Sequence, residues 1–125
     1  MSEQSVSRVG VRFIVESGGE AQGELVRHLS PRTVDTIIRR LPLEGRSALR
    51  RGEVYFQVQL ALGLEKPKKV VEMGQLAYWP YADALSVFLV ASQLQSPVSI
   101  VGSVTSGLKL FTELKSGTKI TMKKD

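Results

Sequence analysis

The chain contains no cysteine and no asparagine, and its 125 residues include a single histidine, His28. Without cysteine there is no disulfide framework, no thiolate zinc site and no cysteine nucleophile. One histidine argues against a histidine-rich metal cluster, and Ser-His-Asp chemistry would have to use His28. We therefore expect neither a metal ion nor a cofactor.

Long hydrophobic runs are also missing. The most apolar stretch, residues 84–91, is far shorter than the roughly 20 residues that a membrane-spanning helix needs. The first residues show no basic segment followed by an apolar one, which predicts no signal peptide, no membrane partner and a cytoplasmic location. The length of 125 residues fits one domain, residues 1–125, and leaves no room for a second core.

Positive charge is concentrated in residues 25–52. This segment has seven arginines against two acids, so its net charge of +5 equals that of the whole chain. Because arginine binds phosphates in a bidentate manner, the segment is a candidate nucleic-acid contact. The alternative is a solvated face on which part of the arginines pair with acids, and no recognised nucleic-acid motif lies beside it. The seven residues are Arg27, Arg32, Arg39, Arg40, Arg46, Arg50 and Arg51.

The hydrophobic periodicity predicts mostly strands. Residues 9–15 alternate between apolar and polar as a half-buried strand does, and a turn at 17–20 leads to a returning strand over 23–29. Ser30 as N-cap and Pro31 as first residue start a helix, which Pro42 ends. We predict a polar connection over 43–51, a short helix near 108–114, and further strands at 53–60, 70–71, 75–79, 85–91, 98–104 and 119–122.

Seven or eight short strands with frequent glycine and proline are typical of a mainly β fold, a sandwich or a barrel. The long helix could plug one open end of such a barrel. Gly102 interrupts the strand at 98–104, which indicates a bulge or a close approach of another backbone.

Three stretches stand out in order along the chain: S-P-R-T-V-D-T-I over Ser30–Ile37, S-V-F-L-V-A over Ser86–Ala91 and I-V-G-S-V over Ile100–Val104. In turn they resemble the start of the first helix, the central Q-F-F strand and the V-F-G strand of cyclophilins. A closer resemblance, over about residues 9–122, is to small cyclophilin-like proteins of archaea and bacteria, through residues 52–56, 74–80, 84–88 and 96–98. The resemblance implies a closed eight-stranded β-barrel with two short helices capping its ends.

The resemblance also implies a chemistry. Cyclophilins isomerise X-Pro bonds, whose rotation barrier is roughly 18–20 kcal/mol, by placing an arginine from an F-H-R strand beside an apolar pocket. Here the corresponding strand reads E-V-Y-F-Q from Glu53 to Gln57, and Ser86 stands where glutamine is usual. Phe88 is the pocket residue that carries over directly.

The leading hypothesis is a binding module whose aromatic-lined groove takes a peptide or small ligand without efficient catalysis. The first alternative is a peptidyl-prolyl isomerase with Arg51 as substitute catalytic arginine, and the second is a nucleic-acid contact through residues 25–52. Packing alone would also account for the aromatic residues. For Glu53, an ion pair with Arg50 or Arg51 is the alternative to a functional carboxylate. The oligomeric state stays open. The candidate ligand-binding residues are Phe88, Tyr78, Trp79, Tyr81, Tyr55 and Gln57.

Overall fold

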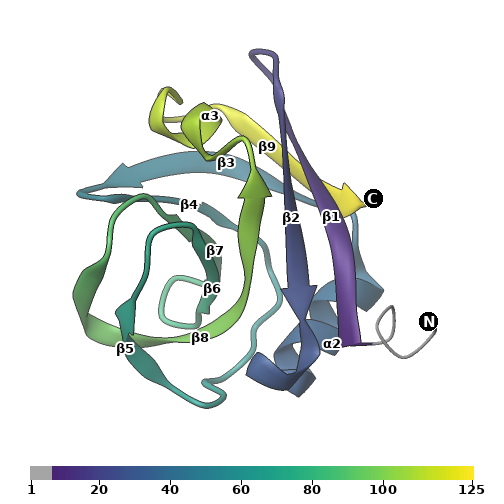
Figure 1. Ribbon diagram of the computed structural model, residues 1–125, viewed down its shortest axis with the longest axis vertical. Helices are drawn as coiled ribbons and strands as arrows, with labels where there is room; N and C mark the ends of the chain where they lie inside the picture. Colours follow the sequence, from purple (N-terminus) through teal and green to yellow (C-terminus); the bar gives the residue numbers. More distant parts are fainter. Residues whose placement is uncertain (1–6) are drawn as a thin grey trace.

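The structure, a computed structural model, describes residues 7–125. Within these residues the chain forms nine strands, two α-helices and one 3-10 turn (Figure 1). The elements are β1 (Arg8–Val15), β2 (Glu20–Val26), η1 (Arg27–Leu29), α2 (Pro31–Arg40), β3 (Leu43–Arg50), β4 (Glu53–Gln57), β5 (Lys68–Val71), β6 (Gln75–Trp79), β7 (Ala84–Phe88), β8 (Ser92–Ser106), α3 (Leu108–Thr112) and β9 (Lys119–Lys124).

Eight of the strands close into an antiparallel barrel. Their order around it is β1-β2-β8-β6-β7-β4-β3-β9, and β9 pairs with β1 again. β5 stays outside the ring and pairs with the first part of β8. The predicted closed eight-stranded barrel is therefore confirmed. The predicted close approach at Gly102 is confirmed as well, because a Cβ there would collide with the Glu24 backbone on β2.

The barrel interior holds the main hydrophobic core. Alternate residues of each strand point inward, as the pleat requires, and Phe13, Phe56 and Tyr78 are among the largest of these buried side chains. α2 adds Val34 and Ile37 to this core. α3 adds Phe111, whose ring meets that of Phe13 edge-on with 5.4 Å between centroids. Figure 1 shows α2 and α3 toward opposite ends of the molecule.

A second apolar layer lies outside the barrel. β8 is 15 residues long, and its first part pairs with β5 while its second part pairs with β6 and β2. The first part and β5 thus cover the outer face of β6 and β7, which explains why every residue of β7 is buried. Val71, Ala77, Phe88, Val98 and Ile100 form this second cluster. Phe88 therefore points away from the barrel interior.

The predicted polar connection over 43–51 is wrong, because these residues form β3. Main-chain pairing with β9 on one side and β4 on the other holds the strand in place. Its polar side chains are tolerated because only Leu43 and Ser47 are buried. A strand whose outer face stays in water needs little apolar content, and sequence periodicity misses it for that reason.

Several predicted boundaries shift by a few residues. β2 spans Glu20–Val26 instead of 23–29, because its last predicted residues turn into η1. β4 ends at Gln57 instead of residue 60, since Gln59 and Ala61 have positive φ angles of 59° and 55°, which an extended strand does not allow. β8 starts six residues before the predicted strand at 98–104, at Ser92.

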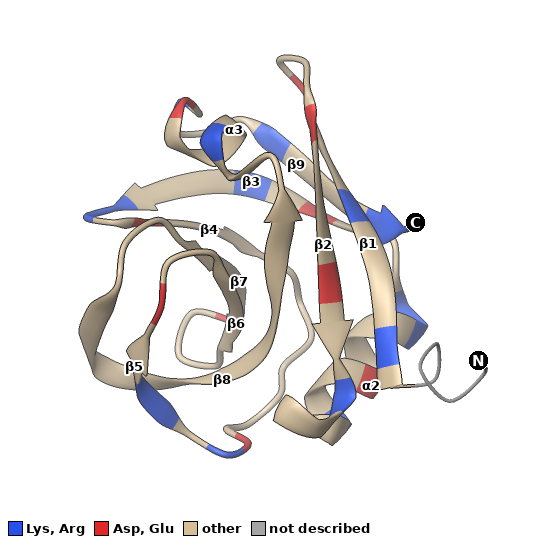
Figure 2. Cartoon of the chain, in the orientation of Figure 1, with Lys and Arg blue, Asp and Glu red and all other residues tan. Residues whose placement is uncertain are grey.

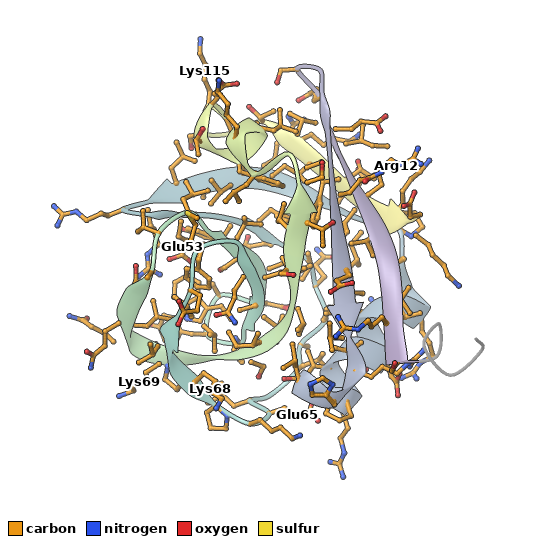
Figure 3. All side chains as sticks on the ribbon, viewed as in Figure 1. Arg12, Glu53, Glu65, Lys68, Lys69 and Lys115 are labelled. Carbon is orange, nitrogen blue, oxygen red and sulfur yellow. The ribbon has the colours of Figure 1, made fainter. Side chains whose placement is uncertain are left out.

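Ser30 does not cap α2 with its side chain, contrary to the prediction. Its hydroxyl donates instead to the Ile100 carbonyl oxygen at 2.8 Å and joins the helix to β8. The N-terminus of α2 is capped from the loop after β4, where the Glu65 carboxylate accepts from the backbone N–H groups of Arg32 (3.0 Å) and Thr33 (2.8 Å). Figure 3 shows Glu65 beside α2.

Candidate functional site

Four strands bring polar and aromatic side chains together on the outer face of the barrel. A two-residue turn, in which Gly52 has a φ of 77°, joins β3 to β4 and sets Arg50 opposite Glu53. Glu53 in turn lies opposite Phe88 on β7. Because outward-pointing residues alternate along each strand, the hairpin sequence places Arg50, Glu53 and Phe88 in one row.

These residues border a small pocket beneath the first part of β8. Its volume is only about 20 Å³, close to the space that one water molecule requires. The pocket is therefore nearly closed in this conformation. Its lining residues are Arg50, Glu53, Trp79, Phe88, Leu94, Gln95, Ser96 and Val98.

Trp79 is the centre of an aromatic cluster at this pocket. Its ring meets Tyr55 edge-on, with 5.4 Å between centroids and an angle of 81°, and stacks on Tyr81 at 6.1 Å and 27°. The Arg50 guanidinium carbon lies 4.5 Å from the Trp79 centroid, a cation–π geometry. Arg50 on β3 and Trp79 on β6 come from strands that β4 and β7 separate, so two long side chains meet across the sheet.

Glu53 is a buried carboxylate with one distant partner. Its side chain is 7% exposed, and the Arg50 Nε atom lies 3.7 Å from its Oε1 atom. Within residues 7–125 its side chain accepts no hydrogen bond, and its oxygens are not among the buried atoms that lack a partner, so they keep some contact with solvent. Burying a charge is costly unless it is paired. Figure 3 shows Glu53 on the side of the barrel around which β8 curves.

Ser86 is a second incompletely satisfied group on the same face. Its hydroxyl oxygen is fully buried and has no hydrogen-bond partner in the described part of the chain. Ser86 lies two residues before Phe88 on β7, between Tyr55 of β4 and Ala77 of β6. The sequence signal for this position was the serine where cyclophilins have glutamine.

Tyr78 points to the opposite side of β6 from Trp79, into the barrel interior. Its hydroxyl donates to Asp83 Oδ1 at 2.6 Å and accepts from the Leu62 backbone N–H at 3.1 Å. Burial, reinforced by the bond to Asp83, raises the pKa of Tyr78 from 10.0 to about 12. Tyr78 does not line the outer pocket, although it was predicted together with Trp79.

Gln57 and Arg51 also lie apart from the pocket. The Gln57 amide donates to the Ala82 carbonyl oxygen at 3.1 Å, and the residue borders a different hollow of about 570 Å³ together with Gly45 and Arg46. Arg51 is exposed in the turn after β3. The guanidinium that reaches the pocket belongs to its neighbour Arg50. Among the predicted ligand-binding residues, the structure brings together Phe88, Trp79, Tyr81 and Tyr55.

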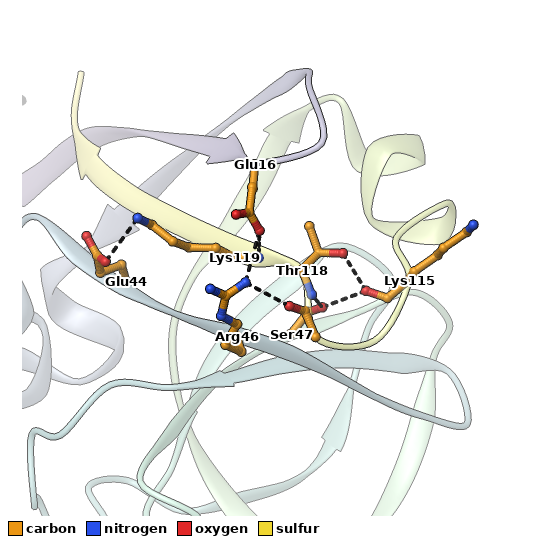
Figure 4. A network of polar contacts seen from close by, with 8 residues as sticks. Glu16, Glu44, Arg46, Ser47, Lys115, Thr118 and Lys119 are labelled. Carbon is orange, nitrogen blue, oxygen red and sulfur yellow. Dashed lines mark hydrogen bonds and ion pairs between the residues drawn. The ribbon is translucent and has the colours of Figure 1, made fainter.

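The seven arginines of residues 25–52 are distributed over η1, α2, β3 and the following turn. Figure 2 shows basic residues on many elements of the molecule. Three of the seven have acidic partners: Arg27 pairs with Asp35, Arg46 with Glu16 at 3.0 Å, and Arg50 with Glu53 at 3.7 Å. Figure 4 shows Arg46 in a polar network that joins β3 to β9 and to the end of β1. The nucleic-acid hypothesis stays a prediction.

The described residues contain neither a membrane-spanning helix nor a cluster of metal ligands. No helix within residues 7–125 is both long and apolar enough to cross a membrane. Over the same range, no three side chains of histidine, aspartate or glutamate gather where they could hold a metal ion.

Comparison with known proteins agrees with this architecture. The hypothetical protein AF2241 from Archaeoglobus fulgidus has a solved structure with a TM-score of 0.75 and 26% identity, covering 95% of this chain and 96% of that one. McbB, solved in complex with tryptophan, also has a TM-score of 0.75, but at 13% identity. That match covers 90% of this chain and 44% of McbB, and it shows the fold alone. No curated protein matches.

The family model described as cyclophilin-like matches residues 9–123. This range agrees with the resemblance found over about residues 9–122. It includes all eight strands of the barrel, except the first residue of β1 and the last residue of β9. The chain therefore belongs to the cyclophilin-like family.

Proposed function

We propose that this protein is a binding module whose site is the outer-face pocket, and that its ligand is a peptide segment or a small molecule of similar chemistry. The convergence of Arg50, Glu53, Trp79 and Phe88 from four strands is the observation that carries the proposal. Half of the lining residues are apolar and half are polar or charged, and ligand sites combine both kinds. Tyr81, which is 88% exposed, extends the aromatic surface beyond the pocket.

Two features favour an occupant over simple packing. The Glu53 carboxylate lines the pocket and accepts no hydrogen bond within residues 7–125, and the Ser86 hydroxyl on the same face is buried without a partner in that range. Buried polar groups are normally paired, so a ligand that donates hydrogen bonds to Glu53 would satisfy the group that borders the pocket. A peptide supplies such donors through its main chain.

Trp79 allows a direct test, because it is the only tryptophan in the chain and its fluorescence reports on this pocket. We expect capped tetrapeptides with apolar or proline residues to change this emission in a saturable manner. The Tyr81→Ala variant, which removes an exposed ring, should weaken binding several-fold. The matched control is Met73→Ala, which removes an exposed apolar side chain outside the pocket. Unchanged emission and unchanged amide NMR shifts with all peptides would contradict the proposal.

Prolyl isomerisation is the second candidate. The specific observation in its favour is a guanidinium, that of Arg50, beside a pocket bounded by Phe88. A guanidinium N–H in this place could donate a hydrogen bond to the prolyl amide nitrogen and weaken amide resonance. This chemistry needs neither a nucleophile nor a general base. Arg51 would have to leave its exposed turn position to reach the same place.

A protease-coupled assay with a proline-containing peptide tests this candidate. The rate should exceed the thermal rate and fall to it in Arg50→Ala. The same assay on Arg51→Ala separates the two arginines, since a loss in that variant instead would assign the donor to Arg51. If the unaltered protein gives no acceleration over the thermal rate, the isomerase candidate is rejected.

A further inference from the structure

The walls of the outer pocket have the chemistry that recognises an organic cation. Trp79 presents a ring face, Tyr55 and Tyr81 flank it, and the buried Glu53 carboxylate supplies a negative charge. Ring faces attract cations through their quadrupole, and a carboxylate in a poorly hydrated place adds to this attraction. The site already contains one cation, the guanidinium of Arg50, 4.5 Å from the Trp79 centroid.

Arg50 is held weakly. Its side chain is 47% exposed, and its contact with Glu53 at 3.7 Å is an ion pair without hydrogen-bond geometry. It comes from the last residue of β3, next to a two-residue turn, on a long flexible side chain. Because nearly half of the Arg50 side chain is already in water, its guanidinium is readily hydrated when it moves out. The cost of that movement falls on the buried Glu53, which loses its partner.

The charge and the volume of the pocket both depend on where Arg50 lies. With Arg50 in place, its charge balances that of Glu53, and only about 20 Å³ of space remains. Once Arg50 leaves, Glu53 is an unbalanced charge in a pocket bordered by Trp79 and Phe88. Such a charge is costly until another cation arrives. The emptied pocket thus selects for positive charge.

We propose that this pocket, as the site of the binding function proposed above, recognises an arginine side chain of a peptide, whose guanidinium replaces that of Arg50 between Trp79 and Glu53. Arg50 acts as an internal stand-in for the ligand. It keeps Glu53 paired in the free protein and competes with the incoming side chain. The ligand class is a peptide with an arginine, since the geometry already accepts a guanidinium.

The test compares two capped tripeptides, Gly-Arg-Gly and Gly-citrulline-Gly, in fluorescence titrations of Trp79. Citrulline keeps the shape of arginine and removes its charge. We expect the arginine peptide to bind at least tenfold more tightly than the citrulline peptide. Arg50→Ala should bind the arginine peptide about tenfold more tightly than the unaltered protein, because the competitor is gone. Glu53→Gln should lose the preference for arginine.

Lys69→Ala is the matched control for general electrostatics, because it removes an exposed cation from β5 outside the pocket. Its affinity for both peptides should stay within twofold of the unaltered protein. Thermal unfolding of every variant checks that it is folded. Should Glu53→Gln fail to fold, Trp79→Leu takes its place, with binding followed by amide NMR, and it should lose arginine binding.

Three outcomes would overturn this inference. Equal affinity for the arginine and citrulline peptides would reject cation recognition while leaving the binding function intact. Weaker arginine binding in Arg50→Ala would show that Arg50 assists the ligand instead of competing with it. No binding of either peptide, in the unaltered protein and in Arg50→Ala alike, would reject the inference, and absence of binding by the apolar and proline peptides as well would reject the binding function.

Discussion

Two neighbouring residues, Tyr78 and Trp79, illustrate how the pleat of a strand assigns different roles. Tyr78 points into the barrel and binds Asp83 and the loop after β4, whereas Trp79 points outward to Arg50. Their sequence suggested one aromatic cluster at a binding site. The alternation of side chains along β6 divides that cluster between a structural position and a candidate ligand position.

Replacing Tyr78 with phenylalanine should destabilise the protein by about 1–3 kcal/mol, because the partly buried Asp83 carboxylate and the Leu62 N–H each lose a hydrogen-bond partner. The measurement is the free energy of unfolding from urea titration. Tyr81→Phe is the control, because Tyr81 is 88% exposed. The free energy of unfolding of this variant should equal that of the unaltered protein. Equal stability of the two variants would contradict the role assigned to Tyr78.

The same residue predicts a pH dependence. Because burial raises the pKa of Tyr78 from 10.0 to about 12, its neutral form is favoured in the folded state. This contribution to stability is complete below pH 10 and is lost as the pH rises toward 12. An absorbance titration of the folded protein should show one late tyrosinate, which is absent in Tyr78→Phe. A tyrosinate of Tyr78 formed near pH 10 would contradict the prediction.

At the same scale, the sequence analysis listed Phe88 and Trp79 as candidates for one site, and both border the outer pocket, but it did not point to Arg50 beside them. The choice between Arg50 and Arg51 depends on which one follows the outward side of β3, and the strand itself was not predicted. For Glu53 the sequence left a functional carboxylate and an ion-pair partner open. Its burial beside the first part of β8 depends on long-range pairing, which no local pattern reveals.

At the scale of elements, the capping of α2 depends on a residue far away in the sequence. Burial alone would raise the pKa of the Glu65 carboxyl, but hydrogen bonds from Arg32 and Thr33 outweigh that effect and lower it. The Thr33 hydroxyl adds a third bond at 2.8 Å. The charged form of Glu65 thus fastens the loop after β4 to the helix, in the place where Ser30 was predicted to act.

Glu65→Gln should reduce the free energy of unfolding by about 1 kcal/mol at neutral pH, the usual size of a lost helix cap. Because the pKa of Glu65 is lowered in the folded state, its contribution is present above pH 4.5 and disappears as the pH falls below that value. Urea unfolding at several pH values should therefore show the difference from the unaltered protein shrinking in acid. Glu113→Gln, at an exposed position, should behave as the unaltered protein at each pH. A difference between Glu65→Gln and the unaltered protein that is constant with pH would reject the charged cap.

β3 and the first part of β8 were not predicted, because neither has the alternating apolar pattern that reveals a strand in the sequence. β1 and β6 have clear apolar content, and their predicted spans match the structure closely. β3 keeps only two buried side chains, so its existence depends on hydrogen bonds to β9 and β4. The first part of β8, with Pro97, exists through its irregular pairing with β5. Long-range pairing, not local pattern, forms both segments.

At the scale of the whole molecule, closure of the barrel depends on the seam between β2 and β8. Gly102 and Gly23 both lie at this seam, where each strand approaches the other's backbone too closely for a side chain. Gly102, which interrupts the apolar pattern of the predicted strand at 98–104, therefore correctly indicated the close approach of another backbone. The closed architecture itself came from resemblance, because strand counts alone fitted a sandwich equally well.

Gly102→Ala should destabilise the protein by about 2–3 kcal/mol, because the new methyl group collides with the Glu24 backbone and forces the seam apart. Urea or thermal unfolding measures the loss. The control is Gly63→Ala, since a Cβ there meets no atom within 4 Å. A Gly102→Ala variant as stable as this control would show that the seam can relax without cost.

The central claim is that the ligand site lies on the outer face, under the first part of β8, and amide NMR mapping tests it most directly. Adding capped peptides that contain arginine or proline should shift the amide signals of residues 50–55, 79–81, 86–88 and 94–98. Shifts confined to the hollow around Gly45 and Gln57, or to the one between Thr33 and Leu64, would contradict the claim. So would a spectrum in which no signal moves.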